Sequence, residues 1–391
     1  MNASSEVRIA RALGPELTAA SLAADAARRA DPKLIRRLRE SGLLAMVIPE
    51  RYGGTQRPAP DSLAVLEELA YADSAVAWCA MIYTTTAMLG SFLPEEWARR
   101  VFSIERSGEV FNCPVAAGAA APSGRGRVVE GGVVVSGRWA WGSGTHHAQW
   151  ICGGTIVEED GKPRTLPNGA PAVHVMFFEP SQVQLHDNWD PSGLRGTGSV
   201  DFEVVEQFVP DGRWTLLGAS RRQVDAPLYR FPFFGYFAGA VACVPLGIAR
   251  RAVDDFADLA QTKRLAPGGP SIASSSVTQL DFGRAEALVQ GAHAVLFHAV
   301  ESVWSQLIDG AKPTLEDRRR LRLAASQATR MSVDAVDILY DAAGGTAVGA
   351  DCSLQKHFRD IHTATAHRMV SREILRMAGA ARLQDETPAN L

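Results

Sequence analysis

Residues 136–150, SGRWAWGSGTHHAQW, bring together side chains suited to holding a flat ring. Alternation along a β-strand places Trp139, Trp141 and Ser143 on one face, where two indoles and a hydroxyl would form a wall. Such a wall suits a flat heterocycle, with the Ser143 hydroxyl donating a hydrogen bond to a ring nitrogen. The same pattern is typical of a core strand whose tryptophans pack against a helix. The stretch alone fits both interpretations.

Histidines are the next candidates for chemistry. His357, His362 and His367 recur every five residues, about 140° apart around a helix, so they cannot converge on one metal ion. At most one of them faces any given pocket, and we predict no metal site. His146 and His147 are neighbours, which in a turn would let either line the mouth of a cavity.

A glycine pair is the third candidate. Gly344, Gly345 and Thr346 follow a helical stretch in DAAGGTAV. Two glycines there allow close backbone approach and offer N–H groups that suit a phosphate or a ribose. The same pair is also common where a helix simply stops.

Three regions of different composition must position these residues. Residues 1–107 have helical patterns, residues 108–225 hold short alternating runs rich in Gly, Val, Thr and Phe, and residues 226–391 return to long helical stretches. Because the strands are confined to the middle, the chain is predicted to be an α+β protein and not a doubly wound sheet. We expect an N-terminal helical domain, a middle antiparallel, β-barrel-like domain and a C-terminal four-helix bundle.

Composition excludes several classes of protein. The 391 residues are 46% hydrophobic and 21% charged, as in a soluble globular protein with a large core. A net charge of −3 without a basic stripe argues against nucleic acid. Five scattered cysteines without a CxxC pair favour the reducing cytoplasm. Residues 231–249 carry no charge, but their two prolines and flanking arginines predict a buried helix and no membrane passage.

The order and spacing of several segments resemble the acyl-CoA dehydrogenase superfamily along nearly the whole chain. These segments are IPERYGG, GGVVVSGRWAWGSGTHHAQW, GLRGTGSVDFEVVEQFVP, DAAGGTAV and LQKHFRDIHTATAH. The resemblance implies a flavin between the β domain and the C-terminal bundle, and assembly as a homotetramer or homodimer. Arg264 is retained from the family's flavin-clamp segment, although the rest of that segment is eroded.

The chain departs from the dehydrogenases at their catalytic base. RDIHTATAHRMV holds no carboxylate between Asp360 and Glu373, and Arg368 falls about where the glutamate base would be. A guanidinium that stays protonated cannot take a proton from the α-carbon of a thioester. The chain instead resembles the reduced-flavin monooxygenases built on this fold. In that branch a serine at the position of Ser143 contacts flavin N5, and a histidine at the position of His367 lies over the C4a edge.

The resemblance implies a two-component monooxygenase. Reduced FAD or FMN, with FADH2 slightly preferred, would come from a separate NAD(P)H:flavin reductase, which agrees with the absence of a nicotinamide-binding fingerprint. With O2 it would form a C4a-hydroperoxide that hydroxylates an electron-rich aromatic or heteroaromatic substrate, phenolic or indolic. The alternatives are an acyl-CoA dehydrogenase or oxidase with a relocated base, an oxygenase that hydroxylates an amine nitrogen, and a flavin-fold protein that has lost catalysis.

The predicted site residues fall into three groups. The catalytic residues are Ser143 and His367. The cofactor contacts are Trp139, Trp141, Ser143, Arg264, Gly344, Gly345 and Thr346. The substrate contacts are Trp78, Tyr83, His146, Phe233, Phe234 and Phe237, although each aromatic side chain among them is equally typical of a core.

Overall fold

The chain begins with helices whose ends are set by capping side chains. The structure, a computed structural model, describes residues 4–218, 221–264 and 266–384. The first helices are α1 (Ser5–Ala27), α2 (Pro32–Glu40), α3 (Ala59–Ala72), α4 (Ser74–Ala87) and α5 (Glu95–Phe102). Asp73 separates α3 from α4 with extended backbone, and its carboxylate accepts the Val76 N–H at 2.7 Å, as an N-cap does. Every residue of α4 is buried, so this helix forms the centre of the N-terminal region.

The middle of the chain folds into β-structure. Strands β1 (Glu105–Ser107) and β2 (Val110–Asn112) form a hairpin. The main sheet contains β3 (Ala116–Val129), β4 (Gly132–Trp139), β5 (Trp150–Glu159), β6 (Lys162–Pro163), β7 (Val173–Phe178), β8 (Gln184–His186), β9 (Asp201–Pro210) and β10 (Trp214–Leu216). Its order is β10-β7-β5-β3-β4-β9-β8, with β6 paired to β5. The β3–β5 pairing is parallel, so the expectation of a purely antiparallel sheet is wrong at this pair.

Long helices form the C-terminal region. They are α6 (Pro227–Arg230), α7 (Phe233–Thr262), α8 (Ser276–Ile308), α9 (Leu315–Ala343), α10 (Ser353–Ala364) and α11 (Arg372–Leu383). Helix α7 is long and apolar enough to span a membrane, but 78% of its most apolar window is buried inside the protein. It packs on α3, α4, α8, α9 and α10. Its apolar composition is therefore accounted for by its place at the centre of the bundle.

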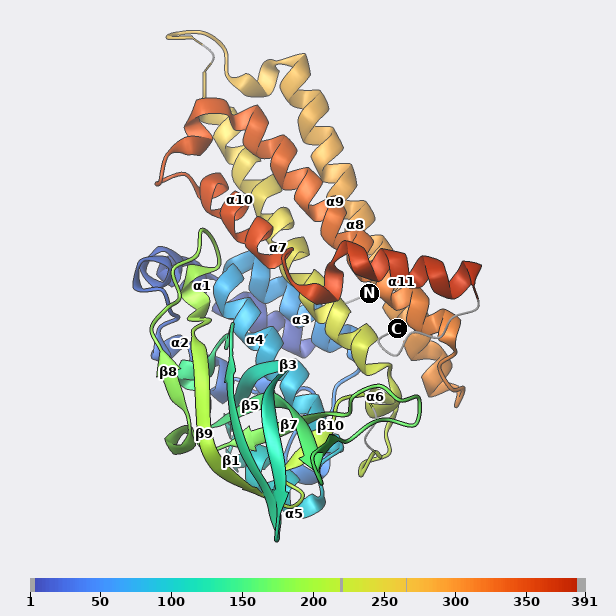
Figure 1. Cartoon of the computed structure of the whole chain (residues 1–391). Helices are drawn as coiled ribbons and strands as arrows, with labels where there is room; N and C mark the ends of the chain where they lie inside the picture. The colour runs from blue at the N-terminus through green and yellow to red at the C-terminus, as the bar shows by residue number, and fades with distance from the viewer. Residues whose placement is uncertain (1–3, 219–220, 265, 385–391) are drawn as a thin grey trace.

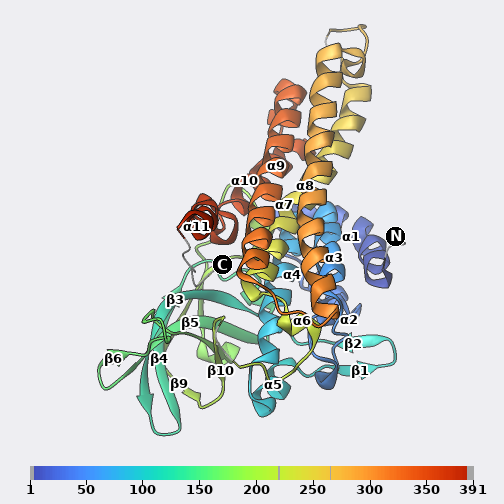
Figure 2. The ribbon, with the colours of Figure 1, turned by 90° about the vertical axis from the view of Figure 1, so that its right-hand side faces the viewer.

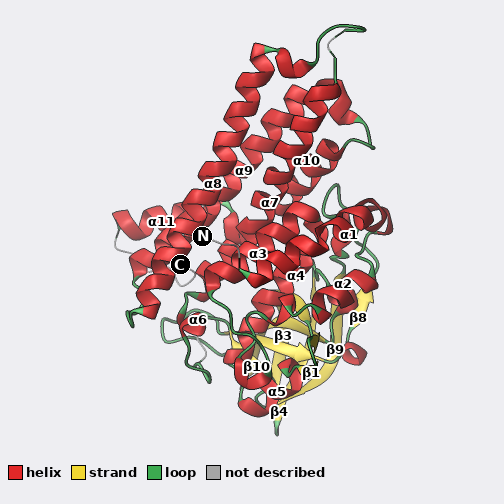
Figure 3. Ribbon diagram, turned by 180° about the vertical axis from the view of Figure 1, so that it is seen from behind, coloured by secondary structure: helices red, strands yellow, loops and turns green. Residues whose placement is uncertain are grey.

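The N-terminal helices lie between the sheet and the C-terminal bundle. In Figure 1 the sheet lies at the bottom, the bundle rises to the top, and α3 and α4 lie between them. Turned by 90°, α8 and α9 run side by side along the bundle while α11 stands apart at its flank (Figure 2). The strands gather at one end when the molecule is seen from behind (Figure 3). This segregation confirms the predicted fold class, and the domain boundaries at 107 and 225 stay predictions.

Candidate active site

The chain turns sharply after β4 and separates its two tryptophans. Strand β4 ends at Trp139, which is fully buried. Trp141 follows with a φ of 62° and 73% of its surface exposed, and Ser143 is buried again. The expectation that alternation places these three side chains on one face is wrong, because the strand stops before Trp141 and the backbone changes direction there.

Trp139 belongs to the core of the sheet. Its ring stacks on Phe202 with the centroids 5.1 Å apart. Gly124 and Gly153 leave space for the indole, since a Cβ on either would lie within 2.6 Å of its ring. The ring has no accessible surface to offer a flat ligand, so the two indoles do not form one wall.

A chain of hydroxyl groups surrounds Ser143. The Trp78 Nε1–H donates to Ser143 Oγ at 3.1 Å, and Ser143 Oγ lies 2.6 Å from Ser199 Oγ. Ser199 Oγ is 2.6 Å from Thr197 Oγ1, which donates to the Leu194 carbonyl oxygen at 2.8 Å. Each hydroxyl has one proton. Because the Thr197 proton goes to a carbonyl, Ser199 must donate to Thr197, and Ser143 must donate to Ser199.

The direction of these hydroxyl hydrogen bonds determines whether Ser143 can donate to a ligand or accept from it. Its proton is used inside the protein, and one of its two lone pairs receives the indole N–H. One lone pair is left. Ser143 is therefore an acceptor, and the prediction that it donates to a ring nitrogen is wrong in direction. A reduced flavin carries a proton on N5, so the acceptor is matched to the reduced form of that ring.

His367 is partly buried and is contacted by two aromatic rings. It makes edge contacts with Trp78, at a centroid distance of 5.6 Å, and with Phe237, at 5.4 Å. Its Nδ1 accepts the Met369 N–H at 3.2 Å, so the neutral ring carries its proton on Nε2. Burial, with a smaller effect from Arg322, lowers the pKa of His367 to about 4. At neutral pH the ring is uncharged, and its Nε2–H has no partner among the described residues.

A buried carboxylate holds the segment that carries the hydroxyl chain. Asp360 on α10 is completely buried and accepts the Leu194 N–H at 2.7 Å. It also accepts the Ser74 hydroxyl of α4, and the Lys356 ammonium pairs with it. These partners hold the pKa of Asp360 below its usual value despite burial. Residues 193–199 are thus fixed to α4 and α10, which places Thr197 and Ser199 beside Ser143.

Gly193 allows the loop of residues 193–199 to lie very close to α10. A Cβ there would lie 2.1 Å from the Arg359 carbonyl oxygen on α10. Only glycine lets the loop approach the helix so nearly. The GLRGTGS motif therefore works as a docking loop for α10.

Tyr83 and His146 both lie close to the turn that carries Ser143. Tyr83 is buried and donates to the Gly144 carbonyl oxygen at 3.0 Å, so it supports the turn from α4. His146 is exposed and lies against Gly198 and Arg29. Burial and the Arg29 charge lower the pKa of His146. Their predicted substrate contacts stay predictions.

Arg264 and the glycine pair lie near the same end of α7, and Lys263 connects the two segments. Arg264 is exposed and donates to the Gly269 carbonyl oxygen at 2.9 Å. The neighbouring Lys263 ammonium donates to the Ala343 carbonyl oxygen, immediately before residues 344–346. Both segments lie at the end of α7 opposite to Phe237. The predicted cofactor contacts are thus divided into two distant groups.

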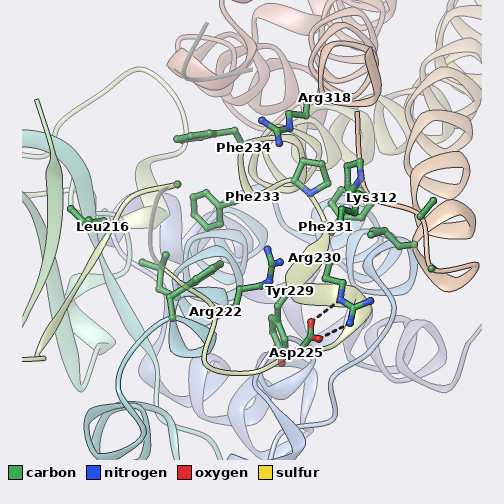
Figure 4. Close-up of a pocket in the computed structure, with 18 residues that line it drawn as sticks. Leu216, Arg222, Asp225, Tyr229, Arg230, Phe231, Phe233, Phe234, Lys312 and Arg318 are labelled. Atoms are coloured by element: carbon green, nitrogen blue, oxygen red, sulfur yellow. Dashed lines mark hydrogen bonds and ion pairs between the residues drawn. The ribbon is translucent and has the colours of Figure 1, made fainter. Parts of the chain in front are cut away.

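A pocket adjoins the aromatic side of the site. It has a volume of about 590 Å³ and is lined by Phe233 and Phe234 at the start of α7 (Figure 4). The two rings contact each other, and Phe233 also contacts Phe237, which touches His367. A continuous row of phenyl rings therefore connects the pocket to His367.

Neither carboxylate that bounds the gap in RDIHTATAHRMV takes the place of the dehydrogenase base. Asp360 is fully engaged with Lys356 and its other partners. Glu373 is exposed and pairs with Arg376 at 2.7 Å, while Arg368 is exposed. Among the described residues, Asp360 and Glu373 are therefore both paired with cations and neither is a free base.

Four residues of this region were not predicted from the sequence. Ser199 and Thr197 lie in GLRGTGS, and Asp360 lies in FRDIH, where the sequence marks it only as one end of the carboxylate gap. A hydroxyl pair two residues apart in a glycine-rich loop was an available signal. The fourth, Arg322, lies in an arginine-rich helix where nothing distinguishes it from its neighbours.

Comparisons with known proteins agree with the fold. The acyl-CoA dehydrogenase N-terminal domain model matches residues 9–102, and the acyl-CoA dehydrogenase C-terminal domain model matches residues 239–372. The chain belongs to the acyl-CoA dehydrogenase family. Relatives that match most of its length are flavin-dependent monooxygenases, which confirms the prediction of the oxygenase branch.

Three of these similar proteins illustrate the relationship. Indole-3-acetate monooxygenase of Acinetobacter baumannii is 29% identical over 88% of this chain and 85% of its own length. The oxygenase subunit HsaA of a flavin-dependent monooxygenase from Rhodococcus jostii is 26% identical over 91% of this chain and 92% of its own. The crystal structure of 3-HSA hydroxylase from Rhodococcus sp. RHA1 has a TM-score of 0.90, 25% identity, and coverage of 99% of this chain and 100% of that one.

Proposed function

We propose that the chain is the oxygenase component of a two-component monooxygenase that hydroxylates an electron-rich aromatic or heteroaromatic substrate. The observation that carries the proposal is the pairing of a Ser143 oxygen acceptor with a neutral His367 donor beside a row of phenyl rings. A carbon acid cannot be deprotonated there, because no described carboxylate is free at this point.

The residues present fit a reduced flavin. Ser143 has an unused lone pair for a ring N–H, and the exposed Trp141 indole next to it suits the face of an isoalloxazine. We assign these two side chains to the flavin ring. Reduced FAD or FMN, when bound, supplies the electrons that activate O2 for transfer of one oxygen atom to the substrate.

The remaining side chains orient the substrate and protect the reaction. His367 Nε2–H donates a hydrogen bond to the oxygen being transferred or to the substrate hydroxyl. Trp78 and Phe237 contact the imidazole and limit its access to water. Phe233 and Phe234 receive the aromatic ring as it enters.

The second group of cofactor residues is assigned to a neighbouring copy. Phe237 touches His367, whereas Lys263 touches Ala343, and these positions are separated along α7 by about 39 Å at 1.5 Å per residue. One flavin does not bridge them. We propose a homodimer or homotetramer in which Arg264, Gly344, Gly345 and Thr346 contact the phosphate side of a flavin bound to another copy.

The proposal includes a separate NAD(P)H:flavin reductase and a cytoplasmic location. All five cysteines are free, and four of them are buried. Thiols without disulfides fit a reducing compartment.

Turnover should depend on a second protein. The purified chain is expected to give no product with NADPH and oxidised flavin, and to hydroxylate a phenolic or indolic substrate when a flavin reductase or chemically reduced flavin is added. Product is quantified by chromatography with labelled O2 as the oxygen source. Turnover by this chain with NADPH alone, or oxidation of an acyl-CoA, would contradict the proposal.

Substituting Ser143→Ala is expected to weaken the preference for reduced over oxidised flavin. The variant loses the acceptor for N5–H, worth about 0.5–1.5 kcal/mol or roughly two- to tenfold in affinity. Anaerobic titration of reduced and oxidised flavin measures the ratio of the two dissociation constants. Ser136→Ala is the control, since that hydroxyl bonds Glu206 on the exposed side of β4. An unchanged ratio in Ser143→Ala would show that this oxygen does not contact the flavin.

A further inference from the structure

Arg322 is a buried cation without a carboxylate partner. Its side chain is 1% exposed in the middle of the protein. Among the described residues, its guanidinium donates only to the Phe234 carbonyl oxygen at 2.9 Å and to the Met369 sulfur at 3.5 Å. Nε is buried with no partner. Since an unpaired buried charge is costly, the fold retains it at the expense of stability.

A second unsatisfied polar group lies next to it on α9. Ser326 is one helical turn beyond Arg322, on the same face, and its buried hydroxyl has no partner among the described residues. Arg322 and Ser326 together form a polar patch of unused hydrogen-bonding capacity in an otherwise apolar region. The patch adjoins the site, because Met369 follows His367 by two residues.

The neighbouring pocket carries an excess of positive charge. Four cationic side chains line it, and its one carboxylate, Asp225, is already paired with Arg230 at 2.6 Å. Figure 4 shows Arg318 beside Phe234, and Lys312 also lines the pocket. Arg318 lies one turn before Arg322 on α9. Arg322 itself does not line the pocket, but it donates to the carbonyl oxygen of Phe234, whose ring does.

We propose that this pocket selects an aromatic substrate that carries a carboxylate, and that Arg322 binds the carboxylate while the phenyl rings hold the aromatic ring. The inference rests on the proposed function and narrows its substrate class. The lining cations attract the anion and the guanidinium pairs with it after it is desolvated. The bound carboxylate then supplies the negative partner that Arg322 lacks within the protein.

The test compares two ligands that share a ring and differ in charge. Phenylacetate and 2-phenylethanol are titrated into the protein with saturating reduced flavin under anaerobic conditions. Wild type is expected to bind phenylacetate about tenfold more tightly, as one charge-assisted hydrogen bond allows. Arg322→Gln should remove this preference and leave 2-phenylethanol within about twofold of wild type. Arg322→Lys should keep part of it.

Arg319→Gln is the matched control, because Arg319 lies on the same helix and pairs with Glu316 at 2.7 Å. It should leave both affinities unchanged. Arg322→Met should not lower the thermal unfolding midpoint, since it removes a buried unpaired charge. Lower stability with an unchanged carboxylate preference would mark Arg322 as purely structural and overturn the inference.

Two further outcomes separate the inference from the function on which it rests. Equal affinities for the two ligands in wild type, with hydroxylation of neutral aromatics intact, would overturn the inference alone. Failure to bind reduced flavin would overturn both. If Arg322→Gln weakens reduced FMN but not reduced riboflavin, the guanidinium binds the flavin phosphate and the inference is again overturned.

Discussion

Substituting His367→Ala is expected to slow hydroxylation by about 10²-fold, as loss of one positioned hydrogen-bond donor does at other active sites. The variant should release hydrogen peroxide in place of product, because reduced flavin still reacts with O2 while oxygen transfer is slowed. The measurement is the ratio of product to hydrogen peroxide at a fixed supply of reduced flavin. An unchanged ratio would remove His367 from the mechanism.

The pH profile adds an independent test of the same side chain. With its pKa lowered to about 4 by burial, His367 stays neutral from pH 6 to 8. The coupling ratio of wild type should therefore show no inflection near 6.5, the usual histidine value. His362→Ala is the control, since this exposed histidine on α10 bonds Asp337. An inflection near 6.5 that disappears in His367→Ala would show that the imidazole acts as a cation or a base.

Substituting Asp360→Ala is expected to lower the free energy of unfolding by about 3–5 kcal/mol. The change leaves the Lys356 ammonium buried without its partner and the Leu194 N–H without an acceptor. Because residues 193–199 would then be released from α10, reduced flavin should also bind more weakly. Urea unfolding and anaerobic flavin titration measure the two effects.

Two variants distinguish the ion pair of Asp360 with Lys356 from the hydrogen bond that Asp360 accepts from Leu194. Asp360→Asn keeps an acceptor for Leu194, so it should lose stability but retain most of the flavin affinity. Adding Lys356→Met to Asp360→Asn removes the orphaned cation and should recover part of the stability. If Asp360→Ala matched wild type in both measurements, the docking of residues 193–199 would not depend on this carboxylate.

The order of the regions and the kind of chemistry could be predicted from local pattern. Helical spacing in the first and last thirds and alternation between them indicate the α, β, α order, because periodicity is a property of neighbouring residues. The missing carboxylate between Asp360 and Glu373 is equally visible in the sequence. The sequence also predicts four site residues that the structure places in successive contact, namely Ser143, Trp78, His367 and Phe237.

The errors arose where the backbone changes direction. Alternation predicts one face for Trp139 and Trp141, but the strand ends at Trp139 and Trp141 takes a positive φ. The role of Ser143 as donor was reversed for a different reason. Its proton direction depends on Ser199, Thr197 and the Leu194 carbonyl oxygen, which lie about 50 residues away in the chain.

The sequence by itself therefore determined the fold class, the oxygenase branch of the family and the residue types at the site. Only the tertiary structure decided which way the Ser143 hydroxyl points, that His367 is neutral with its proton on Nε2, and that Arg322 is buried without a carboxylate. The physical reason is the distance along the chain between the groups that interact. Periodicity and motif spacing report contacts between neighbours in the chain, whereas protonation, hydrogen-bond direction and unpaired charge depend on groups that meet only when distant segments pack together.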